Sequence, residues 1–174
     1  MITVADTSPL RYLILVEAVD VLPRIFGQVH APPEVMQELG ASRSPELEAV
    51  CRWAASPPAW LTVQGPRELD PSIQLGTGET AAVSLARELR ADWILIDERK
   101  GTREARDRGL QVAGTLVVIE EAAARDLLDY EKTKDRLVNH TNFYVTEDVI
   151  RESEQRYRQR KLVQEQQSSQ VEES

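Results

Sequence analysis

Short apolar segments alternate with amphipathic segments along most of this chain, and that alternation restricts the fold more than any other feature of the sequence. Residues 93–96 read Trp-Ile-Leu-Ile, a continuous apolar run typical of a strand covered on both faces. Residues 78–90, which come before it, carry apolar side chains at helical spacing. Strands that alternate with helices pair in parallel through right-handed crossovers, so the sequence predicts an α/β protein with a mostly parallel central sheet. The other predicted strands are 2–5, 28–31, 61–63 and a segment around Val112.

Start and stop signals mark the helices between these strands. Ser8-Pro9 predicts a helix start with Ser8 as the N-cap, and Gly27 and Gly40 are placed to end two short helices. The remaining helices are predicted at residues 45–55, 102–108, 115–127, 129–139 and 146–161.

The length of 174 residues fits one ordinary domain with a sizeable core. Residues 1–128 are predicted to form that domain, and residues 129–161 a helical extension packed on it. Residues 162–174 are rich in Gln, Ser and Glu, which predicts a disordered tail.

The composition predicts a cytoplasmic protein. No apolar run approaches the roughly 20 residues that span a bilayer, and the first residues lack the pattern of a signal peptide. The single cysteine, Cys51, cannot form an internal disulfide.

Four carboxylates are placed so that this fold would bring them together. Asp6 and Asp97 each follow the end of a predicted strand, and the carboxyl ends of parallel strands share one edge of a sheet. Glu79 opens the helix that leads into the Asp97 strand, and Glu38 borders the apolar face of its own helix. Each acid alone has a structural explanation, such as capping or the helix dipole. As a set they would repel one another unless a cation intervened.

Oxygen ligands of this kind select magnesium or manganese, and such a site can hydrolyse a phosphodiester through an activated water. Zinc is disfavoured because the only histidines, His30 and His140, show no ligand spacing. Thr7 and Ser8 are accessory candidates whose hydroxyls could contact the metal or its waters, although capping explains them as well.

Basic residues follow Asp97 directly. Arg99, Lys100 and Arg103 are candidate RNA contacts beside the site, and an ordinary solvated helix face is an equal alternative. The net charge of −8 is unusual for a nucleic-acid binder, but four of these negative charges would belong to the site itself.

Four short motifs, taken together, resemble the PIN-domain superfamily, in the branch of small prokaryotic PIN-like proteins related to VapC-type toxin ribonucleases. They are Ala5-Asp6-Thr7-Ser8-Pro9-Leu10, Pro33-Glu34-Val35-Met36-Gln37-Glu38-Leu39, Gly78-Glu79-Thr80-Ala81-Ala82 and Leu95-Ile96-Asp97-Glu98-Arg99-Lys100-Gly101. Gly114-Thr115-Leu116 also fits that branch.

The resemblance implies a three-layer α/β/α fold in which Asp6, Glu38, Glu79 and Asp97 are the catalytic and metal-binding acids. It implies a magnesium- or manganese-dependent endoribonuclease, a homodimer and, as a partner, a small antitoxin protein. The alternative is a non-catalytic PIN-like module that binds RNA or protein.

Two other enzyme classes fit the residues poorly. Gly76-Thr77-Gly78 does not complete a dinucleotide-binding fingerprint and precedes no P-loop lysine. A phosphatase with an aspartyl nucleophile would need a second acid two residues after Asp6, where Ser8 stands.

Overall fold

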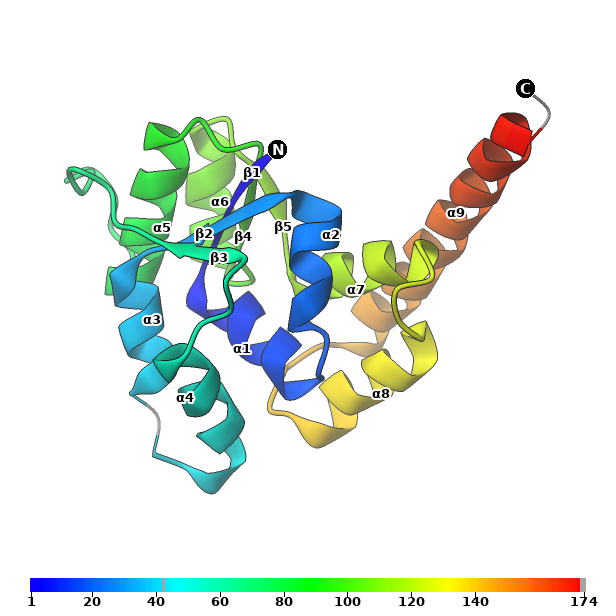
Figure 1. The fold of residues 1–174 in the computed structure, drawn as a ribbon, viewed down its shortest axis with the longest axis horizontal. Helices are drawn as coiled ribbons and strands as arrows, with labels where there is room; N and C mark the ends of the chain where they lie inside the picture. The colour runs from blue at the N-terminus through cyan, green and yellow to red at the C-terminus, as the bar shows by residue number, and fades with distance from the viewer. Residues whose placement is uncertain (42, 173–174) are drawn as a thin grey trace. The chain divides into compact units, whose positions relative to one another are not determined.

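The computed structural model describes residues 1–41 and 43–172, with side chains through residue 169. Its contacts divide the chain into two compact units, Met1–Thr115 and Leu116–Ser174. The predicted domain of residues 1–128 includes all of the first unit and the start of the second. Figure 1 shows the strands within the first unit.

The first unit is built on a five-stranded sheet in the order β3-β2-β1-β4-β5, with every pairing parallel. The strands are β1 (Ile2–Ala5), β2 (Gln28–Ala31), β3 (Leu61–Val63), β4 (Trp93–Leu95) and β5 (Gln111–Ala113). The chain builds outward from β1 to β3 and then crosses back to place β4 on the other side of β1. This reversal makes the β1–β4 pair the switch point of the sheet, and ligands of open α/β sheets bind beyond the carboxyl ends of strands at such a point.

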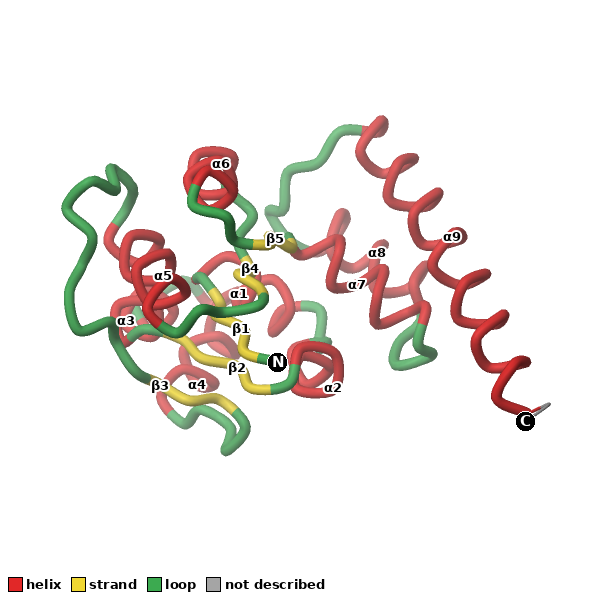
Figure 2. Tube along the Cα trace, turned by 90° about the horizontal axis from the view of Figure 1, so that it is seen from above, coloured by secondary structure: helices red, strands yellow, loops and turns green. Residues whose placement is uncertain are grey.

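Helices cover both faces of this sheet. The helices of the first unit are α1 (Thr7–Leu15), α2 (Leu22–Phe26), α3 (Pro33–Gly40), α4 (Glu48–Ala55), α5 (Thr77–Glu88) and α6 (Arg99–Asp107), with short 3₁₀ turns at Val19–Val21 and Pro45–Leu47. Viewed along the strands in Figure 2, α5 and α6 lie on one side of the sheet and α2 on the other. The predicted three-layer α/β/α architecture is therefore confirmed.

The buried face of α5 packs on the strands of the sheet. Ala82 and Ala86 are fully buried and small, so the helix backbone can approach the strands closely. Leu85 joins Val4 and Ile94 in the same apolar cluster. These contacts fix the helix that carries Glu79 against the two strands that precede Asp6 and Asp97.

The second unit contains α7, α8 and α9, which polar as well as apolar contacts hold together. The bounds of these helices are Thr115–Ala124, Tyr130–His140 and Glu147–Glu172. Glu120 of α7 is fully buried and accepts three hydrogen bonds, at 2.8–3.2 Å, from the guanidinium of Arg156 in α9. Tyr130 of α8 stacks on Tyr157 at 4.4 Å between ring centroids. Pairing and hydrogen bonding offset the cost of burying this charge, so α9 is held to α7 by specific contacts.

Three local expectations differ from the structure. The N-cap of α1 is Asp6 rather than Ser8, because the chain turns into the helix directly after β1. Helix α6 begins at Arg99 rather than Thr102, with Glu98 as its N-cap. Helix α9 continues to Glu172 through a stretch predicted to be disordered, where Gln, Glu, Lys and Leu are good helix formers; residues 173–174 lie outside the described residues.

Within the described ranges no helix is both long and apolar enough to cross a lipid bilayer.

The buried face of α5 provides a stability test. We expect Leu85→Ala to lower the free energy of unfolding by about 2–5 kcal/mol, because it removes a fully buried side chain and leaves a cavity. Leu69, which is 50% exposed, is the matched control, and Leu69→Ala should change the stability by less than about 0.5 kcal/mol. Urea denaturation monitored by circular dichroism measures both. Equal losses would contradict the placement of Leu85.

Candidate active site

Asp6 and Asp97 lie at the carboxyl edge of neighbouring strands. Asp6 follows β1 directly, and its backbone N–H donates to the carbonyl of Leu95 in β4 at 2.9 Å. Asp97 comes two residues after that same Leu95. The β1–β4 pairing thus sets both aspartates at the switch point of the sheet.

Asp97 is held by the residue that opens α7. Its Oδ1 accepts the backbone N–H of Thr115, and its Oδ2 accepts the Thr115 hydroxyl, both at 2.7 Å. Gly114 makes this approach possible, since a Cβ at that position would lie 2.9 Å from Asp97 Oδ1. Thr115 is fully buried, so the orientation of the Asp97 carboxylate is set by the fold itself.

Glu38 reaches the site from α3 and is bound from two sides. Its Oε2 accepts the Thr7 hydroxyl at 2.5 Å, and its Oε1 accepts the Gly78 amide at 2.9 Å. The side chain therefore joins the start of α1 to the start of α5. Any Cβ at position 78 would meet both Glu38 carboxylate oxygens, at 2.6 and 2.7 Å.

Glu79 lies in the first turn of α5. Its Oε2 accepts the Gly76 amide at 3.3 Å, which satisfies one of the free N–H groups at that helix end. Its Oε1 is buried and has no hydrogen-bond partner among the described residues. This oxygen also lies against Gly101 of α6, where a Cβ would approach it to 2.9 Å.

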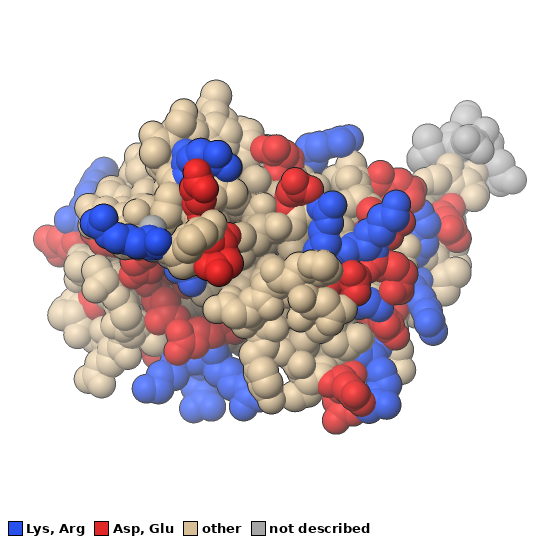
Figure 3. Space-filling view, turned by 90° about the horizontal axis from the view of Figure 1, so that it is seen from below, with Lys and Arg blue, Asp and Glu red and all other residues tan. Residues whose placement is uncertain are grey.

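Burial and neighbouring charges raise the pKa values of three of the four acids. Burial is the main cause that raises the pKa of Asp6 from 3.8 to about 7, and the charges of Glu79, Glu38 and Asp97 add to it. Burial also raises the pKa of Asp97. The pKa of Glu79 is raised by burial and then by neighbouring Glu98. Figure 3, which views the carboxyl edge, shows acidic side chains gathered on this face of the first unit.

The structure thus brings all four predicted acids to one edge, and it also places Thr7 there. Ser8 is half-buried in α1, and no hydrogen bond joins it to the acids in the part of the chain that the structure describes. Sequence reasoning missed the roles of Thr115, Gly78 and Gly114. The only sequence signal for them was that all three stand inside the short motifs.

The four acids offer oxygen donors to a divalent cation, but they do not form a complete ligand set. Across residues 1–41 and 43–172, no three His, Cys, Asp or Glu side chains are arranged to hold a metal ion together. The chemistry of the donor set nevertheless fits, because every donor is an oxygen. Asp6 Oδ1 and Glu79 Oε1 are buried without a hydrogen-bond partner within the described chain. Glu38 and Asp97 keep free lone pairs beyond the hydrogen bonds that they accept.

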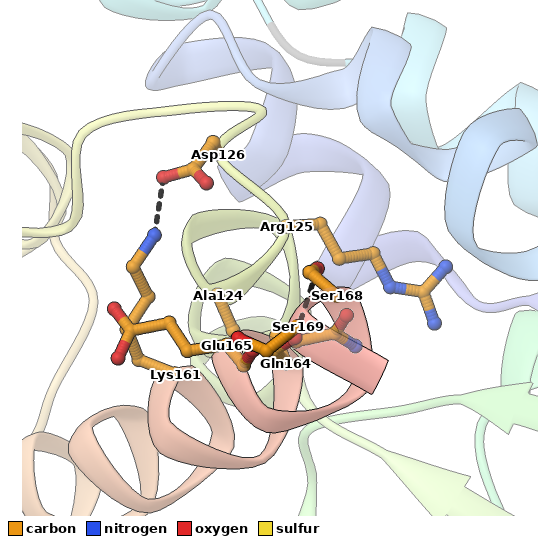
Figure 4. A pocket seen from close by; sticks show the side chains of 8 residues that line it. All are labelled: Ala124, Arg125, Asp126, Lys161, Gln164, Glu165, Ser168 and Ser169. Carbon is orange, nitrogen blue, oxygen red and sulfur yellow. Dashed lines mark hydrogen bonds and ion pairs between the residues drawn. The ribbon is translucent and has the colours of Figure 1, made fainter. Parts of the chain in front are cut away.

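A hollow of about 420 Å³ lies in the second unit between the end of α7 and the later turns of α9 (Figure 4). Its cations are already paired, Lys161 with Asp126 at 2.5 Å and Arg125 with Glu121 at 2.7 Å. Open walls and neutralised charges make it a weaker candidate than the acidic edge.

The fold and the acids define a class of protein, namely an α/β/α protein with a carboxylate-lined site at the switch point of a parallel sheet. A family model described as a PIN domain matches residues 2–159, so the chain belongs to the PIN-domain family. The match extends beyond residue 128 and includes α8 and the first half of α9. PIN domains are in general nucleases, which makes a hydrolase of nucleic acids the broad functional class. No match to the chain was found among curated proteins.

The contact between Gly78 and Glu38 can be tested by adding one methyl group. Gly78→Ala should displace the Glu38 carboxylate and lower the free energy of unfolding by about 1–3 kcal/mol. Gly40 is the matched control, because a Cβ there has no neighbour within 4 Å and Gly40→Ala should stabilise the protein by up to about 1 kcal/mol. Urea denaturation measures both changes. A neutral Gly78→Ala would show that Glu38 does not pack on the start of α5.

The stability of the protein in EDTA should fall as the pH rises from about 4 to about 7. In this window the folded state keeps the proton of Asp6, while the unfolded state releases it near 3.8, so the folded state binds more protons. For Asp6 alone, this difference corresponds to about 4 kcal/mol. The raised pKa values of Asp97 and Glu79 act in the same direction.

Asp6→Asn removes the titrating group and should flatten part of this dependence. The free energy of unfolding from urea titrations at several pH values gives the comparison. A stability that rises across the window, or an unchanged slope in Asp6→Asn, would contradict the burial of a protonated Asp6.

Proposed function

We propose that this protein is a divalent-metal-dependent endoribonuclease that cuts RNA at the carboxyl edge of its sheet. The observation that carries the proposal is the pair of buried carboxylate oxygens, Asp6 Oδ1 and Glu79 Oε1, which lack a hydrogen-bond partner among the described residues. Buried charged groups are stable only when they are paired, protonated or bound to a cation. Membership of the PIN-domain family supports the same chemistry.

In this proposal the four acids are the ligands of the metal ion. Asp6, Glu38, Glu79 and Asp97 hold Mg²⁺ or Mn²⁺, and the oxygens of Asp6 and Glu79 are the ones free to turn toward it. When bound, such an ion neutralises charge on the phosphate and makes water a better nucleophile.

Thr7, Gly78 and Thr115 hold Glu38 and Asp97 in place before any substrate arrives. Preorganised acids of this kind lose little free energy to reorientation when the reaction proceeds. Ser8 keeps an accessory role beside Thr7, and Arg99, Lys100 and Arg103 are proposed to contact RNA.

A second candidate, a PIN-like module that binds RNA or protein without cutting, is favoured by two observations. No complete set of three metal ligands is arranged among the described residues, and both Asp97 oxygens are engaged by Thr115. The proposal also includes a toxin role, a small antitoxin partner, a homodimer and a cytoplasmic location. The toxin role, the antitoxin and the homodimer are supported by the resemblance to VapC-type proteins.

Cleavage of RNA separates the two candidates. We expect the purified protein to cut RNA in Mg²⁺ or Mn²⁺ and to lose activity in EDTA. Asp6→Asn and Asp97→Asn should each lower the cleavage rate at least about 100-fold, because each removes a charged ligand. Gel analysis of a labelled RNA gives the rates, and circular dichroism verifies folding.

The exposed acid Glu68 provides the control, since Glu68→Gln changes the net charge by the same amount. Its rate should match that of the unaltered protein. RNA binding without metal-dependent cutting, or equal rates in all variants, would support the non-catalytic candidate.

A further inference from the structure

Helix α6 carries an unusual density of unpaired positive charge. Four of its nine residues are basic, and all four are exposed: Arg99, Lys100, Arg103 and Arg106. We call these four residues the basic stripe. None of them forms an ion pair or a side-chain hydrogen bond in the portion of the chain that the structure describes. Unpaired cations gain the most from an incoming anion, because no existing pair has to be broken.

The acids interleaved with the stripe do not neutralise it. Glu104 turns away to Arg108, with 2.5 Å between the charged groups. Arg108 is also engaged by Asp70 and by the Ser72 hydroxyl. Asp107 is exposed and forms no ion pair within the described ranges. The alternation of signs in the sequence therefore does not produce an alternation of ion pairs along the helix.

The helical spacing sets the three arginines of the stripe on one face, with Lys100 beside it. Arg99, Arg103 and Arg106 are at i, i+4 and i+7 and lie one above another. The buried residues Gly101 and Ala105 occupy the opposite face, which packs on the rest of the first unit. From Arg99 to Arg106 the helix rises about 10 Å.

The stripe begins at the acidic site. Helix α6 has Glu98 as its N-cap, and Glu98 follows Asp97 directly. Contact between Gly101 and Glu79 Oε1 fixes the same end of the helix against the acids. Figure 3 shows a group of Lys and Arg side chains at the lower border of the acidic patch. A polyanion held at the acids could thus continue along the helix without crossing a second acidic surface.

We propose that the basic stripe binds the phosphates of the RNA strand on one side of the cleaved bond. This inference rests on the proposed function and adds the path of the substrate to it. Helix α6 has no aromatic residue on which a base could stack, so the contacts are with the backbone and do not read sequence. Arg99, nearest the acids, positions the phosphate beside the cut, and Arg103 and Arg106 follow the strand.

Salt dependence of binding tests this path. The full-length protein is titrated with a fluorescein-labelled single-stranded RNA in Ca²⁺, with the RNA checked to be intact on a gel. The triple variant Arg99→Gln/Arg103→Gln/Arg106→Gln should bind about 10- to 100-fold more weakly. This estimate assumes that each of the three exposed contacts contributes a factor of about two to five and that the factors multiply. The slope of log K against log salt should become shallower by about 2, because each lost phosphate contact removes about 0.7.

Arg24→Gln/Arg52→Gln/Arg67→Gln is the charge-matched control. It removes three exposed arginines outside α6 and changes the net charge equally. An equal loss of affinity or slope in the control would overturn the proposal, since net charge alone would then explain binding. A loss confined to one of two RNA sequences, one rich in A and one rich in U, would also overturn it, because phosphate contacts ignore the bases.

The cleavage assay distinguishes failure of the stripe from failure of the proposed function. If the triple variant binds RNA normally while the unaltered protein cuts it in Mg²⁺, the path is wrong and the nuclease stands. If the triple variant binds weakly but the unaltered protein cuts nothing, the stripe is an RNA-binding surface of a protein without nuclease activity.

Discussion

The parallel pairing of β1 with β4 brings two carboxylates to one edge of the sheet, and the electrostatic cost of that arrangement determines much of the surrounding structure. The bond from the Asp6 amide to the Leu95 carbonyl fixes the register of the two strand ends. Glu38 and Glu79 are then carried to the same edge by α3 and α5. Like charges brought this close in a partly buried site repel strongly, so each needs a compensating interaction. Hydrogen bonds from backbone amides and side-chain hydroxyls provide part of this compensation.

The compensation is uneven, and this unevenness is informative. Glu38 and Asp97 each accept hydrogen bonds on both oxygens, whereas Asp6 and Glu79 each keep one buried oxygen without a partner among the described residues. The first pair is therefore fixed in orientation, and the second pair keeps capacity for a proton or a cation. A raised pKa of about 7 for Asp6 shows that, without a cation, protonation relieves part of the repulsion near neutral pH. A cation and a proton would compete for the same oxygen.

Sequence patterns predicted the parts of this site that depend on strand order. Asp6 and Asp97 could be placed because strand ends of a parallel sheet share an edge, and Glu79 because its helix leads into β4. The partners of the acids could not be predicted in this way. The Thr115–Asp97 contact depends on the close approach at Gly114, and the Glu38–Gly78 contact depends on how α3 packs on α5. Ser8-Pro9 predicted Ser8 as the N-cap of α1. The N-cap is Asp6, because the helix begins directly after the end of β1.

The acidic net charge and the proposed RNA substrate are compatible because an approaching polyanion meets local charge and not the sum over the chain. Screening limits each exposed charge to about 8–10 Å at physiological ionic strength, which is comparable to the length of the basic stripe. Along that length the unpaired cations of α6 dominate, since Glu104 and Asp70 are occupied by Arg108. At the acids a divalent ion would reverse the local sign. The same chain can therefore be acidic as a whole and attract RNA along one face.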